Sequence, residues 1–284
     1  GVTVRDLPQG DTYASLDGIV DAIRADGIDV LITDVGSAVA TYVFSRRAAP
    51  VQMWAEMGYP FWSIGDLDWV LLSGRDHQGY YGIPGNRWSP TIDRCSSDML
   101  VRKVTDAQVE AARRVVTPGG FVMACFARLT KLTPQYLRMV RRLLRDIPMA
   151  RFLLVGGGAS HDAELFVADP EYCGRVMIIR ELVDPNVYAG VVDVFLDTFP
   201  IAGGGAVREI MACGVPVVAM RGGDYDGMVI DQRDPRLCAW TEDEYCAIVG
   251  RLANDTEFRI SCREGALDLG RQFMQAEDMI GPIE

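Results

Sequence analysis

Residues 194–218, VFLDTFPIAGGGAVREIMACGVPVV, form the stretch that decides the fold. The apolar run at residues 194–196 is typical of a parallel strand that is buried on both faces. Three glycines follow, then residues 206–213 with the composition of a helix, a glycine suited to a helix end, and a second apolar run at residues 215–218. This order predicts a strand, a glycine turn, a helix and the next strand of a parallel sheet.

The glycine turn predicts a place where an anion binds. A helix that begins directly after a strand presents unpaired N–H groups and the positive end of its dipole to the loop. A ligand can approach the backbone closely at the small residues Gly203, Gly204, Gly205 and Ala206. The run matches neither G-x-G-x-x-G nor a Walker loop, so a tight turn that only packs a helix on a sheet is the alternative. Glu209 is placed to contact a pair of ribose hydroxyls, with a plain surface glutamate as the alternative.

The composition limits the class of protein. At 284 residues, with 49% hydrophobic residues, the chain is expected to form two globular domains. A formal net charge of −11 argues against a nucleic-acid partner, because a phosphate backbone requires a basic surface. Seven cysteines without a C-x-x-C pair argue against a zinc site and favour reduced thiols in a cytoplasmic protein. No apolar run approaches the roughly 18 residues of a transmembrane helix, so no membrane span is expected.

The first half of the chain alternates between strands and helices. Apolar patterns predict helices at residues 16–25 and 38–44 and strands at residues 2–7, 28–32, 51–54 and 69–72. The run 28–32 has the composition of a strongly buried strand. Residues 76–86 are expected to be a loop, and residues 89–101 contain no convincing element. This order implies a parallel α/β domain over residues 1–100 with right-handed crossovers, followed by a linker at residues 101–119.

The second half, residues 120–284, repeats the alternation. Thr133 is expected to cap a helix that has Pro134 at its first position. A capping box of Thr241 with Glu244 predicts another helix, and a last one begins at Asp255. Strands are predicted at residues 121–126, 152–155, 176–179 and 194–196, with a short helix at residues 186–191. Ligands of such sheets bind at the carboxyl ends of the strands.

Lys131 lies in the loop after the strand at residues 121–126. The glycine turn should lie on the same edge of the same sheet, so a lysine and a helix N-terminus are expected to converge there. A fixed cation at that place would offset the charge that develops on a departing diphosphate. A solvated lysine is the alternative interpretation.

Two D-x-D triplets, which begin at Asp66 and at Asp224, are candidates for chelating a divalent metal beside a nucleotide. Neither follows a nucleotide-binding strand in the arrangement that a metal site needs. The sequence therefore predicts no metal site.

The order of several motifs resembles a known family. Residues 121–155, FVMACFARLTKLTPQYLRMVRRLLRDIPMARFLLV, and then residues 193–220, DVFLDTFPIAGGGAVREIMACGVPVVAM, resemble the catalytic C-terminal domain of the protein O-GlcNAc transferases. That family includes the related bacterial adhesin N-glycosyltransferases. The segments DGIDVLITDV, RRAAPVQMWAEMGYP and LDWVLL, within residues 26–72, resemble the end of the family's N-terminal catalytic domain. The match extends over about residues 21–273.

The resemblance implies the GT-B fold, in which two Rossmann-like domains face each other across a cleft that binds a UDP-sugar. Residues 1–100 would then be the C-terminal part of an incomplete acceptor-side domain, and residues 120–284 the nucleotide-sugar-binding domain. The implied reaction is inverting, needs neither metal nor cofactor, and moves a hexosyl or N-acetylhexosaminyl group. The acceptor would be a serine, threonine or asparagine of a protein, or a glycan. The chain is expected to be truncated at its N-terminus.

The resemblance also implies roles for residues around the diphosphate. Lys131 matches the lysine that neutralises the donor diphosphate, and Arg128 a polar donor contact in the same loop. Gly204, Gly205 and Ala206 align with the phosphate-binding turn.

Other positions match the nucleoside and sugar contacts of the family. Glu209 falls where the family has an acidic residue that holds the ribose, and Tyr188 falls near the residues that flank the uracil. On the sugar side, the family's G-Y-P turn corresponds to Gly58, Tyr59 and Pro60.

Three departures leave alternatives open. The phosphate turn carries no side-chain donor, the histidine near the start of the family's catalytic region is missing from this sequence, and no tetratricopeptide array is present. The acceptor is therefore open. The alternative functions are a sugar-nucleotide epimerase of similar architecture and a non-catalytic UDP-sugar-binding or scaffolding domain, the second of which the bare phosphate turn favours.

Overall fold

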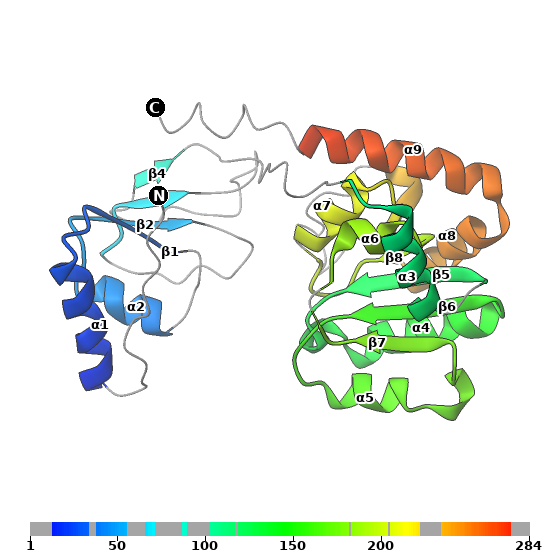
Figure 1. Ribbon diagram of the computed structural model, residues 1–284, viewed down its shortest axis with the longest axis horizontal. Coiled ribbons are helices and arrows are strands. Elements are labelled where there is room, and N and C mark those ends of the chain that lie inside the picture. Colours follow the sequence, from blue (N-terminus) through cyan, green and yellow to red (C-terminus); the bar gives the residue numbers. More distant parts are fainter. Residues whose placement is uncertain are drawn as a thin grey trace. The chain divides into compact units, whose positions relative to one another are not determined.

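The computed structural model of the chain describes residues 13–33, 38–55, 66–71, 87–89, 103–116, 119–181, 183–203, 205–221 and 234–273 (Figure 1). The chain divides into two compact units, Gly1–Cys95 with Ala276–Glu284, and Ser96–Gln275. Each unit is built on a parallel sheet, as the sequence predicts. The strand expected at residues 2–7 and the loop expected at residues 76–86 lie outside the described residues.

The first unit has, in its described part, a sheet in the order β1-β2-β3-β4. Two helices, α1 and α2, pack against each other and share a buried cluster with Trp54 of the sheet, because apolar residues recur at helical spacing along one face of α1. The bounds are α1 (Tyr13–Ala25), β1 (Val30–Thr33), α2 (Ala38–Ser45), β2 (Val51–Ala55), β3 (Trp69–Leu71) and β4 (Arg87–Ser89). The sequence does not predict β4, because its residues, Arg-Trp-Ser, do not form an apolar run.

Strand β1 corrects an expectation. The sequence predicts a strongly buried strand at residues 28–32, but Val30 is 45% and Ile32 is 55% exposed. The reason is position, because β1 pairs only with β2 among the described strands and is the outermost strand of the described sheet. An apolar run indicates that a segment favours a strand, whereas the burial of its side chains depends on which neighbouring elements cover them.

The second unit contains a larger sheet, which in its described part has the order β10-β9-β8-β5-β6-β7. Its strands are β5 (Phe121–Phe126), β6 (Ala150–Val155), β7 (Val176–Ile179), β8 (Val194–Leu196), β9 (Val217–Met220) and β10 (Cys238–Ala239). The central strand β5 is buried along its whole length, which explains its unbroken apolar sequence. The strand expected at residues 215–218 begins two residues later, after Pro216, which has no N–H to give to a ladder.

Helices cover both faces of this sheet (Figure 1). Side chains of α4, α5 and α8 join one buried cluster, and those of α3, α6 and α7 join the other. The bounds are α3 (Asp106–Val116), α4 (Pro134–Asp146), α5 (His161–Val167), α6 (Pro185–Ala189), α7 (Gly205–Ala212), α8 (Glu242–Asn254) and α9 (Thr256–Phe273). In the described parts of the chain, no helix is both long and apolar enough to cross a bilayer.

Helix α3 lies inside the segment that the sequence predicts as a linker, residues 101–119. It packs against α6 and buries Ala112 and Val116, so this part of the segment belongs to the second unit. A capping box begins the helix: the N–H of Gln108 donates to the Thr105 hydroxyl, and the Gln108 side chain accepts from the N–H of Thr105 at 2.9 Å.

Candidate functional site

The strand order of the second sheet fixes where a ligand would bind. From β5 the sheet extends through β6 and β7 on one side and through β8, β9 and β10 on the other. Ligands of such sheets bind outside the carboxyl ends of the strands, where this order reverses. Here that point lies between β5 and β8, so the loops that follow these strands, residues 127–133 and 197–203, form the candidate site.

The loop after β5 is fixed to the end of β6. The N–H of Ala127 donates to Val155 O at 2.9 Å, and the N–H of Leu129 donates to Gly157 O at 3.0 Å. Between these bonds the segment after β5 and the segment after β6 approach each other so closely that a β-carbon at Gly156 would lie 1.8 Å from Ala127 O. Only glycine fits there, so Gly156 determines how the loop leaves the sheet.

Lys131 ends a short 3-10 helix, Leu129–Lys131, in this loop. Its half-buried side chain reaches the loop after β8, where Nζ donates to Ala202 O at 2.8 Å. The structure thus brings together Lys131 and the segment that precedes α7. Arg128 starts the 3-10 helix and is exposed.

The chain uses lysine rarely. Lys103 and Lys131 are its only lysines among 28 basic residues, so all the others are arginine. An arginine at residue 131 would carry the same charge on a larger planar group. The rarity of lysine in this chain is therefore a signal in the sequence that residue 131 requires a compact ammonium group.

The loop after β8 is organised by Asp197, which the sequence predicts only as the end of a strand. The Asp197 carboxylate is buried and accepts hydrogen bonds from the N–H groups of Thr198 at 2.9 Å and Gly203 at 2.6 Å. The Thr133 hydroxyl, at the cap of α4, donates to Phe199 O at 3.3 Å and ties the two loops together a second time.

Helix α7 follows the glycine turn as the sequence predicts; it begins at Gly205, one residue before the expected start, and continues through Ala206 and Glu209. Both side chains are half-buried. Burial raises the pKa of the Glu209 carboxyl, and the nearby Asp184 carboxylate adds to the rise by like-charge repulsion. Glu209 therefore lies in an environment that differs from that of a plain surface glutamate.

Helix α6 brings Tyr188 toward the carboxyl end of β5. Its half-buried ring packs edge-on against Phe126, the last residue of that strand, with 6.5 Å between ring centroids. Burial raises the pKa of the Tyr188 hydroxyl, and Glu181 adds to the rise. The helix is capped by Asp184, whose carboxylate accepts from the N–H of Asn186 at 3.0 Å.

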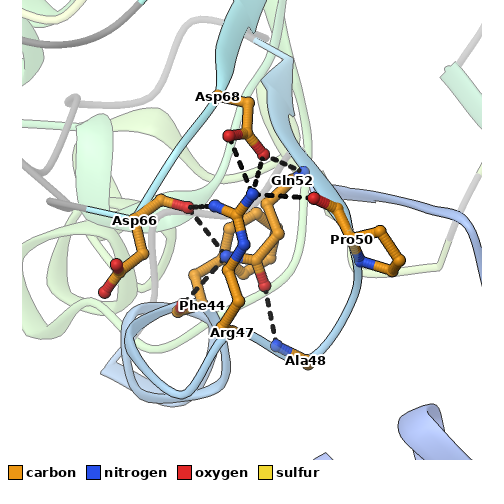
Figure 2. Close-up of polar contacts among 7 residues, drawn as sticks. All are labelled: Phe44, Arg47, Ala48, Pro50, Gln52, Asp66 and Asp68. Carbon is orange, nitrogen blue, oxygen red and sulfur yellow. Dashed lines mark hydrogen bonds and ion pairs between the residues drawn. The ribbon is translucent and has the colours of Figure 1, made fainter.

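Several predicted residues lie outside the described part of the chain: Gly58, Tyr59, Pro60, Gly204, Asp224, Tyr225 and Asp226. The other D-x-D triplet, at Asp66, has a structural role (Figure 2). Arg47 donates to both carboxylate oxygens of Asp68, at 2.8 and 2.7 Å, and to the main-chain oxygens of Asp66 and Pro50. The buried Gln52 side chain donates to Asp66 O at 2.8 Å, so this cluster joins the end of α2 to β2 and β3.

Known proteins confirm the predicted resemblance. The chain is 24% identical over 323 residues to the probable UDP-N-acetylglucosamine–peptide N-acetylglucosaminyltransferase SPINDLY of Petunia hybrida. The match covers 95% of this chain and 32% of that protein, so the chain spans about a third of its relative. No protein-family model matches.

Solved structures of other proteins share the fold. An O-GlcNAc transferase of Thermobaculum terrenum superposes with a TM-score of 0.64 and 23% identity, over 95% of this chain and 54% of that one. Anabaena HepE in complex with UDP and glucose gives a TM-score of 0.72 at 16% identity, over 95% of this chain and 80% of that one. The chain therefore has the GT-B glycosyltransferase fold that the sequence predicts.

Proposed function

We propose that this chain, a relative of the O-GlcNAc transferases, is a glycosyltransferase that moves a hexosyl or N-acetylhexosaminyl group from a UDP-sugar to a protein or glycan. The observation that carries the proposal is the bond between Lys131 Nζ and Ala202 O, which holds an ammonium group just before the start of α7. A cation and a helix N-terminus then meet at the point where the strand order reverses.

This arrangement is suited to stabilising a leaving diphosphate. The ammonium group of Lys131 has three N–H donors, of which the bond to Ala202 uses one. The others are available to phosphate oxygens as the glycosidic bond breaks and negative charge develops on UDP. The acceptor hydroxyl or amide nitrogen would attack the anomeric carbon from the opposite face in a single displacement, which inverts its configuration. The bond from that carbon to the diphosphate oxygen breaks, UDP leaves with the electron pair, and the acceptor's proton is released to solvent.

Nucleotide binding without a metal tests the donor site. We expect calorimetry to detect UDP binding in excess EDTA, because Lys131 and main-chain N–H groups take the place of a cation at the diphosphate. Amine-selective labelling read by mass spectrometry locates the nucleotide, since UDP should slow labelling of Lys131 but leave the exposed Lys103 unchanged. Binding that disappears on chelation and returns with manganese, or equal protection of both lysines, would contradict this site.

Glu209 is proposed to accept hydrogen bonds from the ribose. We expect Glu209→Ala to weaken UDP binding by about 1–3 kcal/mol, the usual loss for a charged acceptor. The raised pKa of Glu209 makes the wild-type affinity pH-dependent: the carboxylate exists above that pKa and is protonated as the pH falls through it. UDP affinity should therefore decline on acidification at a higher pH than an ordinary glutamate would give.

Matched variants separate Glu209 from other titrating groups. Glu209→Gln should flatten the decline on acidification, and Asp184→Asn should move it to lower pH, because the like-charge neighbour is removed while an N-cap side chain is kept. An unchanged UDP affinity and pH profile in Glu209→Gln would show that the Glu209 carboxylate does not bind the ribose.

A non-catalytic UDP-sugar-binding role is the second candidate. It is favoured by a phosphate turn of glycines and alanine, which offers no side-chain donor. Incubation with UDP-N-acetylglucosamine or UDP-glucose distinguishes the two, because a transferase hydrolyses the donor slowly, with water taking the sugar and UDP released, whereas a binding domain returns the donor intact.

A further inference from the structure

Asp197 connects the rigid sheet to the loop that Lys131 contacts. It follows β8 directly and is 2% exposed. Its N–H donates to Val218 O at 3.0 Å, and its C=O accepts from the Tyr245 hydroxyl at 3.2 Å, which also donates to Val218 O at 2.9 Å. The backbone of Asp197 is therefore held by β9 and by α8.

The side chain of Asp197 then fixes the loop from inside. One oxygen, Oδ1, accepts from the N–H of Gly203 at 2.6 Å, six residues further along the chain. The fit is tight, because a β-carbon at Gly203 would lie 2.9 Å from that oxygen and 2.7 Å from Val207 Cγ2. Glycine at residue 203 is thus needed for this bond as well as for the turn.

The bond to Gly203 controls the partner of Lys131. The N–H of Gly203 and the C=O of Ala202 belong to one peptide group, which is planar, so fixing one end fixes the other. Asp197 holds its N–H end, and Lys131 Nζ donates to its C=O end at 2.8 Å. A carboxylate, a peptide and an ammonium group form one chain, in which each charged end polarises the peptide and strengthens the bond at the other.

The charges of Asp197 and Lys131 also affect Cys125, a buried residue of β5. Burial raises the pKa of the Cys125 thiol to about 12; among the smaller influences, Asp197 raises this pKa and Lys131 lowers it. Asp197 and Lys131 therefore lie within electrostatic range of the same atom of β5.

We propose that Asp197 is a positioning residue for Lys131: it sets the orientation of the Ala202–Gly203 peptide and so the place of the ammonium group. This inference rests on the proposed function, in which Lys131 acts on the diphosphate. Without the carboxylate, the peptide can rotate, its C=O leaves Lys131, and the ammonium group loses the contact that aims it.

Labelling kinetics without nucleotide test the contact by itself. With an amine-selective reagent, the rate at Lys131 divided by the rate at Lys103 should rise roughly ten-fold in Asp197→Ala, as expected for the loss of a charge-assisted hydrogen bond. Asp197→Asn keeps an acceptor oxygen and should give a smaller rise. The matched control is Asp193→Asn, at the amino end of the same strand, whose carboxylate accepts from the N–H of Val122 at 2.8 Å and has no part in the loop.

The outcomes are distinct. If Asp197→Ala does not fold, the same labelling ratio is measured in Asp197→Asn and Gly203→Ala. The Gly203→Ala variant keeps the Asp197 carboxylate but displaces the hydrogen bond that it accepts from the N–H of residue 203. A labelling ratio that stays at the wild-type value in folded variants overturns the inference, whether or not UDP binds. Absence of UDP binding in wild type would instead overturn the proposed function. With an active donor–acceptor pair and rates normalised to the concentration of folded, UDP-binding sites, Asp197→Asn should still lower kcat more than it raises KM, whereas a merely structural loss would leave kcat per folded site at the wild-type value.

Discussion

Replacing Lys131 with alanine is expected to lower kcat by roughly 100-fold or more, the range seen when a fixed electrostatic donor is removed. The effect on UDP affinity should be smaller, because the charge that Lys131 offsets is greatest as the glycosidic bond breaks. Steady-state kinetics with the donor and acceptor measure the effect on kcat, and UDP titration measures the effect on affinity.

Matched lysine variants make this result specific. Lys131→Arg should recover little activity, because a planar guanidinium cannot occupy the half-buried position from which Nζ reaches Ala202 O. Lys103→Ala removes the other lysine, which is exposed, and should leave kcat near the wild-type value. A near-normal kcat in Lys131→Ala would contradict the proposed role of Lys131, and the loop would then only connect β5 to α4.

Gly156→Ala is expected to have the largest effect on stability, about 3 kcal/mol or more, at the upper end of overpacking costs. The added β-carbon would lie 1.8 Å from Ala127 O, so the ends of β5 and β6 must separate. Separation also strains the bond from the N–H of Leu129 to Gly157 O, and it moves the loop that carries Lys131. Urea unfolding followed by far-UV circular dichroism measures the loss.

Gly157→Ala is the neighbouring control. Apart from its chain neighbours, the nearest heavy atom to a β-carbon there would be Arg180 O at 4.0 Å, and the substitution should change stability by less than about 1 kcal/mol. Equal unfolding midpoints for the two variants would show that the ends of β5 and β6 can separate at little cost.

Local patterns predicted much of the second unit. The strand at residues 176–179 has the predicted bounds, and Thr133 caps α4 as expected, its hydroxyl accepting from the N–H of Tyr136. Thr241 likewise caps α8, although the carboxylate of Glu244 accepts from the N–H of Trp240 rather than from that of the cap residue. These features depend on residues a few positions apart, which is the range over which a sequence pattern acts.

What was missed depends on residues far apart in the chain or on weaker signals. The approach of Gly156 to Ala127 O and the link from Asp197 to Lys131 through one peptide are tertiary contacts between separate loops. Helix α3 does have a local signal, the capping box of Thr105 with Gln108, although the position of the segment between the two halves of the chain favours a linker.

The exposed apolar residues of β1 affect how the protein behaves at high concentration. Among the described strands β1 is the outermost of its sheet, and its Val30 and Ile32 side chains are exposed apolar surface, which favours pairing of two molecules through this strand. The net charge of −11 opposes such pairing by mutual repulsion, but a Debye length of roughly 10 Å at 0.1 M salt confines that repulsion to short range. The colloidal stability of the protein should therefore fall as salt is added, the reverse of the behaviour of proteins that associate through opposite charges.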